Sequence, residues 1–237
     1  MKRQLKFLAT LSLLVSATSF ANAATISLSN GNLDTIAIGP QTLATPVGWG
    51  VNAFLPTGPF SDGASSETFA NVLDPNGYGV FFKPFQGAAT NKITVDLYQN
   101  NPATAGLNYT LTGWAGAGAN YIGLTDSTVG SLFYISFLGS SSNVLGGATL
   151  NLMTAGLGSG APTSPATGFG YHPFSLTAIA PAGTVTIQVG AEMINAYNNP
   201  LGGDQAFVVD AFTLAPEPSV LSLAALGLAA ILVRRRR

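Results

Sequence analysis

The sequence predicts an all-β protein, arranged as a two-sheet sandwich of the jelly-roll type. Short runs of alternating apolar and polar residues recur along the chain, and Gly, of which there are 28, Pro, Asn and Ser separate these runs. Alternation with a period of two places one face of a strand on a core and the other toward solvent. No internal segment keeps a helical period over about eleven residues. About nine or ten short strands at this spacing are typical of a sandwich.

Two alternating runs give the clearest strands. Residues 93–98 alternate Ile, Val and Leu with Thr, Asp and Tyr, and residues 184–189 alternate Thr and Gln with Val and Ile. Further strands are expected where β-branched and aromatic residues gather between turn residues. These lie at residues 25–29, 78–82, 108–114, 132–138, 148–152 and 207–214.

The chain divides into three segments. We expect a secretory signal peptide at residues 1–23, a β-sandwich domain at 24–214 and a sorting tail with a short transmembrane-like helix at 215–237. A domain of this length buries enough surface to fold without disulfides or structural metal ions. The absence of Cys excludes disulfides, thiolate metal sites and Cys nucleophiles.

The N-terminus has the three parts of a secretory signal. Cations lie within residues 1–6, an apolar run follows at 7–15, and Ala21 and Ala23 give the small-x-small pattern that signal peptidase reads. We therefore expect export through the Sec translocon and Ala24 as the first mature residue. The alternative is an uncleaved anchor, which the short apolar run disfavours.

The C-terminus has the pattern of a second targeting signal. Pro216, Glu217 and Pro218 precede the uncharged residues 219–233, and the chain ends in Arg234, Arg235, Arg236 and Arg237. A helix of this apolar stretch rises only about 23 Å, so it could just span a membrane with the preceding residues included. The arginines orient it with the domain outside. The prolines stop the helix, so the Pro-Glu-Pro segment should be extended and accessible at the outer surface.

This order of motif, apolar stretch and terminal Arg run resembles the PEP-CTERM sorting signal of bacterial surface and exopolysaccharide-associated proteins. The resemblance implies that an exosortase, a membrane enzyme, cleaves near Pro-Glu-Pro. The inner membrane would then hold the protein only transiently, before it reaches the cell surface or matrix of a Gram-negative bacterium. An ordinary tail anchor that begins with Pro-Glu-Pro is the alternative. A sorting signal gives an address and leaves the activity of the domain open.

The charge of the central domain excludes polyanionic partners. Seven of the nine Lys and Arg residues lie at the two ends, which leaves Lys83 and Lys92 in the domain. Nine of the ten acidic residues lie there too, so its formal charge is −7. Binding a phosphate backbone requires neutralising cations. We therefore expect no nucleic acid partner and no affinity for anionic lipid.

Five local sequences resemble, in order, parts of galactose-binding-like carbohydrate-binding modules. They are Asn-Gly-Asn-Leu-Asp at 30–34, Pro-Val-Gly-Trp at 46–49, Tyr-Thr-Leu-Thr-Gly-Trp at 109–114, Ala-Pro-Ala-Gly-Thr at 180–184 and Phe-Val-Val-Asp-Ala-Phe-Thr-Leu at 207–214. The resemblance implies a jelly-roll fold and a domain that contacts polysaccharide. Relatives with this fold but without a sugar site leave the second implication open.

The same resemblance implies a structural calcium ion that ties the first strand to the last. The matching positions are Asn32, Asp34 and Asp210, and calcium accepts such oxygen ligands in flexible geometry. The family often has two adjacent acids near the end, whereas here Asp210 is followed by Ala211. Alternatively, Asp34 is a turn residue and Asp210 a hydrogen-bonded strand acid.

Aromatic rings that could stack on a sugar are also candidates for the core. The possible rings are Trp49, Trp114, Tyr78, Tyr121, Tyr171 and Tyr197. Because buried aromatics are common in sandwiches, the core or rim is the stronger expectation for each ring. The alternation along residues 109–114 would place Trp114 on the outer face of its sheet.

Motifs for catalysis are mostly missing. His172 is the single histidine, and the chain has no Gly-x-Ser-x-Gly elbow, so a Ser-His-acid triad and multi-histidine zinc sites lack support. A glycosidase with two carboxylates stays open, since the fold brings such acids together. We expect a non-enzymatic surface or matrix protein that contacts exopolysaccharide. The alternatives are a structural matrix protein without a ligand and a secreted glycosidase.

Overall fold

The computed structural model of the chain describes residues 27–38, 43–72, 76–158 and 169–217. These residues form thirteen strands and three short 3-10 turns, and they include no α-helix. The all-β prediction is therefore confirmed. The signal peptide, most of residues 156–170 and the apolar C-terminal stretch with its arginines lie outside the described residues. Within the described part of the chain, no helix has the length and apolar character needed to cross a membrane.

The first sheet has six strands in the order β10-β9-β12-β7-β3-β4, and all its pairs are antiparallel. Its two central strands, β7 and β12, are the longest and contain most of the two alternating runs. The bounds are β3 Gly50–Leu55, β4 Gly58–Phe60, β7 Ile93–Pro102, β9 Gly130–Leu138, β10 Val144–Asn151 and β12 Thr186–Ala196.

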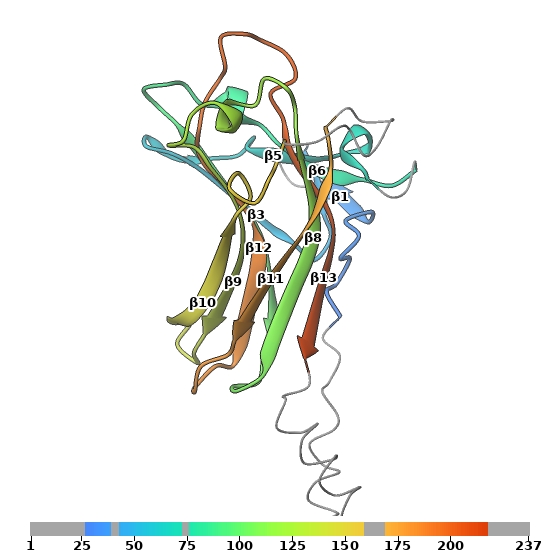
Figure 1. Cartoon of the computed structure of the whole chain (residues 1–237), viewed down its shortest axis with the longest axis vertical. Coiled ribbons are helices and arrows are strands. Elements are labelled where there is room, and N and C mark those ends of the chain that lie inside the picture. Colours follow the sequence, from blue (N-terminus) through green and yellow to red (C-terminus); the bar gives the residue numbers. More distant parts are fainter. Residues whose placement is uncertain (1–26, 39–42, 73–75, 159–168, 218–237) are drawn as a thin grey trace, which may run out of the picture.

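The second sheet has five strands in the order β11-β8-β13-β6-β5, again antiparallel throughout. Its bounds are β5 Ala64–Glu67, β6 Gly79–Phe82, β8 Asn108–Ala117, β11 His172–Ile179 and β13 Phe207–Glu217. In Figure 1 the strands β9, β10 and β12 of the first sheet lie opposite β8, β11 and β13 of the second.

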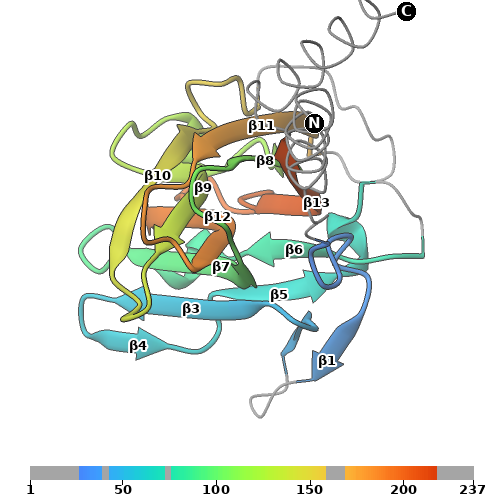
Figure 2. The same ribbon diagram turned by 90° about the horizontal axis from the view of Figure 1, so that it is seen from below.

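The smaller elements lie at the ends of the sandwich. A two-stranded sheet consists of β1, Ile36–Ile38, and β2, Ala44–Pro46. The 3-10 turns are η1, Thr68–Ala70, η2, Pro84–Gln86, and η3, Ile122–Leu124. Figure 2, seen from below, places β1 at the side of the domain where β5 and β6 lie.

The hydrophobic core lies between the two sheets and is built from alternate residues of the long strands. In β7 every second side chain from Ile93 to Leu97 is fully buried, and β12 repeats this from Ile187 to Met193. The second sheet contributes aromatic rings, among them Phe207 and Phe212. Since successive side chains of a strand point to opposite faces, burial of one set leaves the other set for the outer face. The two-sheet sandwich predicted from alternation is confirmed.

One predicted strand is wrong in the part that the structure describes. Residues 27–29 were expected in a strand, but no strand begins before β1 among the described residues. The reason is a side chain from the core. The buried amide of Gln99 accepts a hydrogen bond from the Ser29 N–H at 2.9 Å and donates to the Ser29 carbonyl at 2.8 Å. Asn30 then turns the chain with a φ of 51°.

A β-bulge in β13 joins the last strand to the start of the domain. The pairing of β13 with β8 shifts register between Asp210 and Thr213, and Ala211 within the shift has a φ of 51°. The N–H of Phe212 donates to the carbonyl of Gly31 at 2.7 Å. A Cβ at Gly31 would lie only 2.4 Å from the Phe212 carbonyl oxygen, so this contact requires glycine. The bulge turns Phe212 into the core after Phe207 and Val209.

Candidate functional site: a polar groove on the six-stranded sheet

A polar groove crosses the outer face of the six-stranded sheet. It has a volume of about 250 Å3 and is open to solvent. Strands β7, β9, β10 and β12 supply its lining, which consists of Asp96, Tyr134, Ser136, Thr149, Gln188 and Glu192. All of these side chains are carboxylates, amides or hydroxyls. Such groups are the hydrogen-bonding partners that a polyhydroxylated ligand requires.

The strand register brings these residues together. Asp96 of β7 stands directly opposite Glu192 of β12. On the same face, two residues along the strands from this pair, Gly190 of β12 lies between Tyr98 of β7 and Tyr134 of β9. The hydroxyl of Tyr134 reaches across β12 and donates to Asp96 Oδ1 at 2.8 Å.

Two glycines clear space for the tyrosine rings. A Cβ at Gly50 of β3 would lie 2.4 Å from Cζ of Tyr98, so the ring lies over this glycine. A Cβ at Gly190 would lie 2.0 Å from the Leu97 carbonyl oxygen and 3.1 Å from the Tyr134 hydroxyl. Glycine in a strand interior often marks a close approach of this kind. The result is a floor on which aromatic side chains lie low over the sheet.

Burial raises the pKa values of the two carboxyl groups in the groove. For Asp96, burial raises the pKa to about 6, against the lowering effect of the hydrogen bond from Tyr134. Burial also raises the pKa of Glu192, and the neighbouring charge of Asp96 adds to that shift. Two carboxylates on one face therefore interact with each other, and no cation lies among the residues that line the groove.

Both lysines of the domain already have acidic partners. Lys83 is buried and its Nζ contacts Asp62 at 2.5 Å. The Nζ of Lys92 lies 3.9 Å from Asp126 and also lies over the ring of Tyr197, 5.0 Å from its centroid. Each lysine that the structure describes therefore has an acidic partner.

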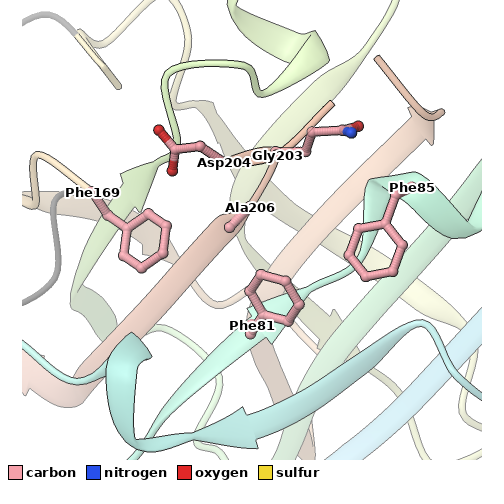
Figure 3. A pocket seen from close by; sticks show the side chains of 7 residues that line it. Phe81, Phe85, Phe169, Gly203, Asp204 and Ala206 are labelled. Carbon is pink, nitrogen blue, oxygen red and sulfur yellow. The ribbon is translucent and has the colours of Figure 1, made fainter. Parts of the chain in front are cut away.

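A second hollow lies on the outer face of the other sheet and has a different character. Its volume is about 480 Å3, and Phe81, Phe85 and Phe169 surround it, with Ala206 between them (Figure 3). The Phe81 and Phe85 rings lie 6.0 Å apart. Phe85 is 41% exposed, so this hollow presents apolar rings to solvent.

The polar groups beside the phenylalanine hollow are already used by the fold. Asp204 accepts a hydrogen bond from the N–H of Ala119 at 2.8 Å. Gln205 accepts from the N–H of Asn199 at 2.6 Å and donates to Asn198 at 3.1 Å. These side chains hold loops in place. In the groove on the six-stranded sheet, Gln188 donates to Asn100 at 3.1 Å and Asp96 accepts from Tyr134, and both side chains also line the solvent-open hollow.

The aromatic residues singled out from the sequence belong mainly to the core or to its margins. Trp49, Tyr121 and Tyr171 are buried, as the stronger expectation held. Trp49 donates through Nε1 to the Asn30 carbonyl at 3.0 Å and packs on Phe212. Trp114 lies partly buried on the outer face of the five-stranded sheet, beside the apolar cluster of Tyr171. Tyr78 and Tyr197 are likewise half-buried, and none of the six lines the groove.

The residues predicted for calcium lie at the junction of the first loop and the last strand. Asp34 accepts a hydrogen bond from the Tyr78 N–H at 2.8 Å, and Asn32 donates to its other oxygen at 2.5 Å. Asp210 accepts from the Val72 N–H at 2.8 Å and from the Ala211 N–H at 2.6 Å. Burial raises the pKa of Asp210 to about 7, and the charge of Asp34 contributes to the rise.

This donor set fits a divalent cation in its chemistry. Two carboxylates lie close enough to repel each other, and a carboxylate oxygen can bind a cation as well as accept a hydrogen bond. Within the described residues, no group of three or more His, Asp or Glu side chains is gathered for a metal. Further ligands from the described residues would be backbone or amide oxygens.

His172 has no catalytic neighbourhood in the described structure. It begins β11, opposite Ala115 of β8, and its Nε2 is buried without a hydrogen-bond partner among the described residues. A triad requires that nitrogen to face a nucleophile.

The sorting motif begins inside the folded domain. Strand β13 passes the expected boundary at Leu214 and runs on to Glu217, with Pro216 opposite Tyr109 of β8. The extended form expected for Pro216 and Glu217 is therefore observed, and Pro218 lies outside the described residues. A protein-family model described as the PEP-CTERM protein-sorting motif matches residues 214–237.

The chain carries a PEP-CTERM sorting motif. The motif covers the last tenth of the chain and implies export and sorting by an exosortase-type system. It says nothing about the activity of the sandwich. No curated protein sequence matches the chain.

Several solved structures resemble this chain in fold. The active domain of tailspike protein 4 from bacteriophage CBA120 has a TM-score of 0.51 at 13% identity and covers 81% of this chain. The chain spans about a fifth of that tailspike chain, 21% of its length. TmCBM61, solved with β-1,4-galactotriose, has a TM-score of 0.44 at 14% identity, with 81% of this chain and 99% of that one covered. A CBM4 structure has a TM-score of 0.40 at 16% identity, with 81% and 100% covered. At these identities the likeness is one of fold.

Sequence reasoning did not single out the residues of the groove. Asp96 and Gln188 were seen only as members of the polar halves of two alternating runs. The signal that could have found them was the hydrogen-bonding side chains at the polar positions of these runs. An outward set of Asp, Tyr, Asn and Gln on neighbouring strands is a candidate binding face once the strand order is known.

Proposed function

We propose that this protein is a non-enzymatic surface or matrix protein that binds a neutral polysaccharide in the groove of its six-stranded sheet. The observation that carries the proposal is the combination of a partly exposed tyrosine ring with amide and carboxyl groups on one sheet face. Tyr98 is half-buried and offers apolar ring surface with a polar edge, while the buried Tyr134 positions Asp96 through its hydroxyl. Gln188 and Glu192 offer partners for hydroxyl groups beside them.

The size and charge of the groove support a polymer over a small enclosed ligand. Pockets that enclose small molecules usually have about 300–1,000 Å3, and the groove has about 250 Å3 and is open. A chain lying across the strands would seat one sugar unit at a time. The paired carboxyl groups and the absence of a lining cation disfavour an acidic polysaccharide.

The route to the cell surface is part of the proposal. Residues 1–23 direct the chain to the Sec translocon, and signal peptidase cleaves after Ala23. The C-terminal tail holds the protein in the inner membrane until an exosortase acts near Pro-Glu-Pro. The mature product is a strongly acidic sandwich at the cell surface or in the extracellular matrix.

Structural calcium is the proposed cofactor. Asp34 and Asp210 would hold it, together with oxygen atoms from the loop around Asn32. The ion would neutralise two repelling carboxylates and tie the opening loop to the bulge of β13. It supplies stability, with no part in ligand chemistry.

A secreted glycosidase is a second candidate, because one observation favours it. Asp96 and Glu192 are direct cross-strand neighbours in a groove, and burial raises the pKa of each. Glycosidases use two carboxyl groups of this kind, one as acid and one as nucleophile or base. A structural matrix protein without a ligand is the remaining alternative.

The test is retention of the purified exported protein on the exopolysaccharide of its own host. The Tyr98→Ala and Gln188→Ala variants should lose retention. The matched control is Phe85→Ala, which removes a partly exposed ring from the other hollow and should bind like wild type. Absence of retention on any host polymer would favour the structural role. Release of reducing sugar that disappears in Glu192→Gln would establish the glycosidase instead.

A further inference from the structure

The end of β13 and the start of the sorting motif are one continuous strand. Within this strand Pro216 stands opposite Tyr109, and Glu217 stands opposite Asn108 at the beginning of β8. On its other side β13 pairs with β6 only over Phe207 to Val209. The last residues of β13 are therefore attached to one neighbouring strand among those described, and they can detach without opening the middle of the sheet.

The carboxylate of Glu217 is held by two side chains of β8. Asn108 donates through Nδ2 to Glu217 Oε2 at 2.8 Å, and Thr110 donates through Oγ1 to Glu217 Oε1 at 2.6 Å. Thr110 is itself 2.8 Å from the hydroxyl of Thr177 on β11. Each carboxylate oxygen thus has its own donor, and hydrogen bonds to a charged group are stronger than those between neutral groups.

An enzyme that reads the Pro-Glu-Pro segment needs its backbone and the glutamate side chain. In the folded domain the backbone of Glu217 is paired with β8, and its carboxylate is occupied by Asn108 and Thr110. Recognition of an extended segment commonly uses its unpaired backbone groups together with alternate side chains. The carboxylate and the backbone groups that face β8 are available only after the end of β13 has left the sheet.

We propose that Asn108 and Thr110 are positioning residues for the sorting step: they dock Glu217 on β8, and the exosortase-type enzyme gains the motif only when this strand end detaches. The folded sandwich thereby limits the rate of its own processing. The inference rests on the sorting function that the motif implies, and it is independent of polysaccharide binding.

The decisive experiment follows processing of the full chain by pulse-chase in a host that contains the exosortase. The double variant Asn108→Ala/Thr110→Val should be processed about three- to tenfold faster, because two charge-assisted hydrogen bonds are lost. Asn108→Asp should act in the same direction, since it places a carboxylate beside Glu217 without removing volume. The matched control is Thr112→Val, which removes the equivalent bond of Thr112 to Thr213, 2.6 Å, within the same strand pair.

Hydrogen exchange provides a readout that does not depend on the enzyme. Amides of residues 214–217 should exchange faster in the double variant than in wild type, while those of β12 stay unchanged and the melting temperature moves little. Processing that is unchanged or slower in both variants would overturn the proposal, as would unchanged exchange. If processing persists in a strain without exosortase, the sorting function itself fails, and the exchange experiment still tests the docking of Glu217.

Discussion

Asp96 of β7 and Glu192 of β12 are direct neighbours on the open face of the six-stranded sheet. Like charges placed directly opposite each other destabilise a sheet. The structure lessens the conflict by raising the pKa of both groups through burial and by giving Asp96 a hydrogen bond from Tyr134. No cation lines the groove to neutralise Asp96 and Glu192. We infer that this carboxyl pair serves ligand binding, since it does not stabilise the sheet.

The first prediction concerns the pH dependence of stability. Burial raises the pKa of Asp96 from 3.8 to about 6, so the folded state binds a proton more tightly than the unfolded state. Stability from this group is therefore present below about pH 4 and is lost as the pH rises through about 6. Asp96→Asn should raise the melting temperature at pH 7 by roughly 2–6 °C. Thermal melts at pH 4 and 7 check this, and an equal gain at both pH values would contradict it.

The second prediction concerns the floor of the groove. Gly50→Ala should displace the ring of Tyr98, because the new Cβ would lie 2.4 Å from Cζ of that ring. The ring can move toward solvent, so polysaccharide retention should fall while the fold persists. Gly203→Ala, at the other hollow, is the control, since a Cβ added there would have no atom within 4 Å. Equal retention by both variants would count against the groove as the binding site.

The third prediction concerns the buried amide of Gln99. Its replacement by Leu leaves the N–H and carbonyl of Ser29 and the carbonyl of Gly48 without their partner. Ser29 and Gly48 are exposed, so water can take the place of the amide, and a lost hydrogen bond then costs about 0.5–1.5 kcal/mol; we expect Gln99→Leu to destabilise the fold by about 1–3 kcal/mol. Urea unfolding measures it. Gln188→Leu makes the same chemical change on the outer face and should alter stability by less than about 0.5 kcal/mol.

The fourth prediction concerns calcium. If Asp34 and Asp210 hold a structural ion, excess chelator should lower the melting temperature, and added calcium should restore it. Asp34→Asn should abolish this response, because one of the two carboxylates is lost. Asp204→Asn, at the phenylalanine hollow, should keep it. A melt that does not change in excess chelator would refute the ion, and the pair would then be turn and strand acids held by backbone N–H groups.

Much of the architecture could be predicted from alternation. Residues 93–98 and 184–189 gave β7 and the first part of β12, because burial of one face imposes a period of two on each strand. Short strands such as β4 and β5 escaped prediction. Their Gly, Pro and Ser residues have little strand preference, and pairing with β3 and β6 holds them in place.

The candidate site could not be predicted in the same way. The sequence identified Asp34 and Asp210 as a pair only through a resemblance, and it gave no reason to join Asp96 to Glu192. These last two residues are far apart in the chain and meet because β7 pairs with β12 in one particular register. A shift of one residue would turn every side chain of the strand to the other face.

The sequence by itself determined the C-terminal sorting motif, the acidic character of the domain and the alternating strands, since each depends on local composition or a period along the chain. Only the tertiary structure decided which outward residues share a face and where the sorting motif begins. The order β9-β12-β7 assembled the groove, and the pairing of β13 with β8 placed Glu217 beside Asn108 and Thr110. Both depend on contacts between distant segments, which local patterns do not encode.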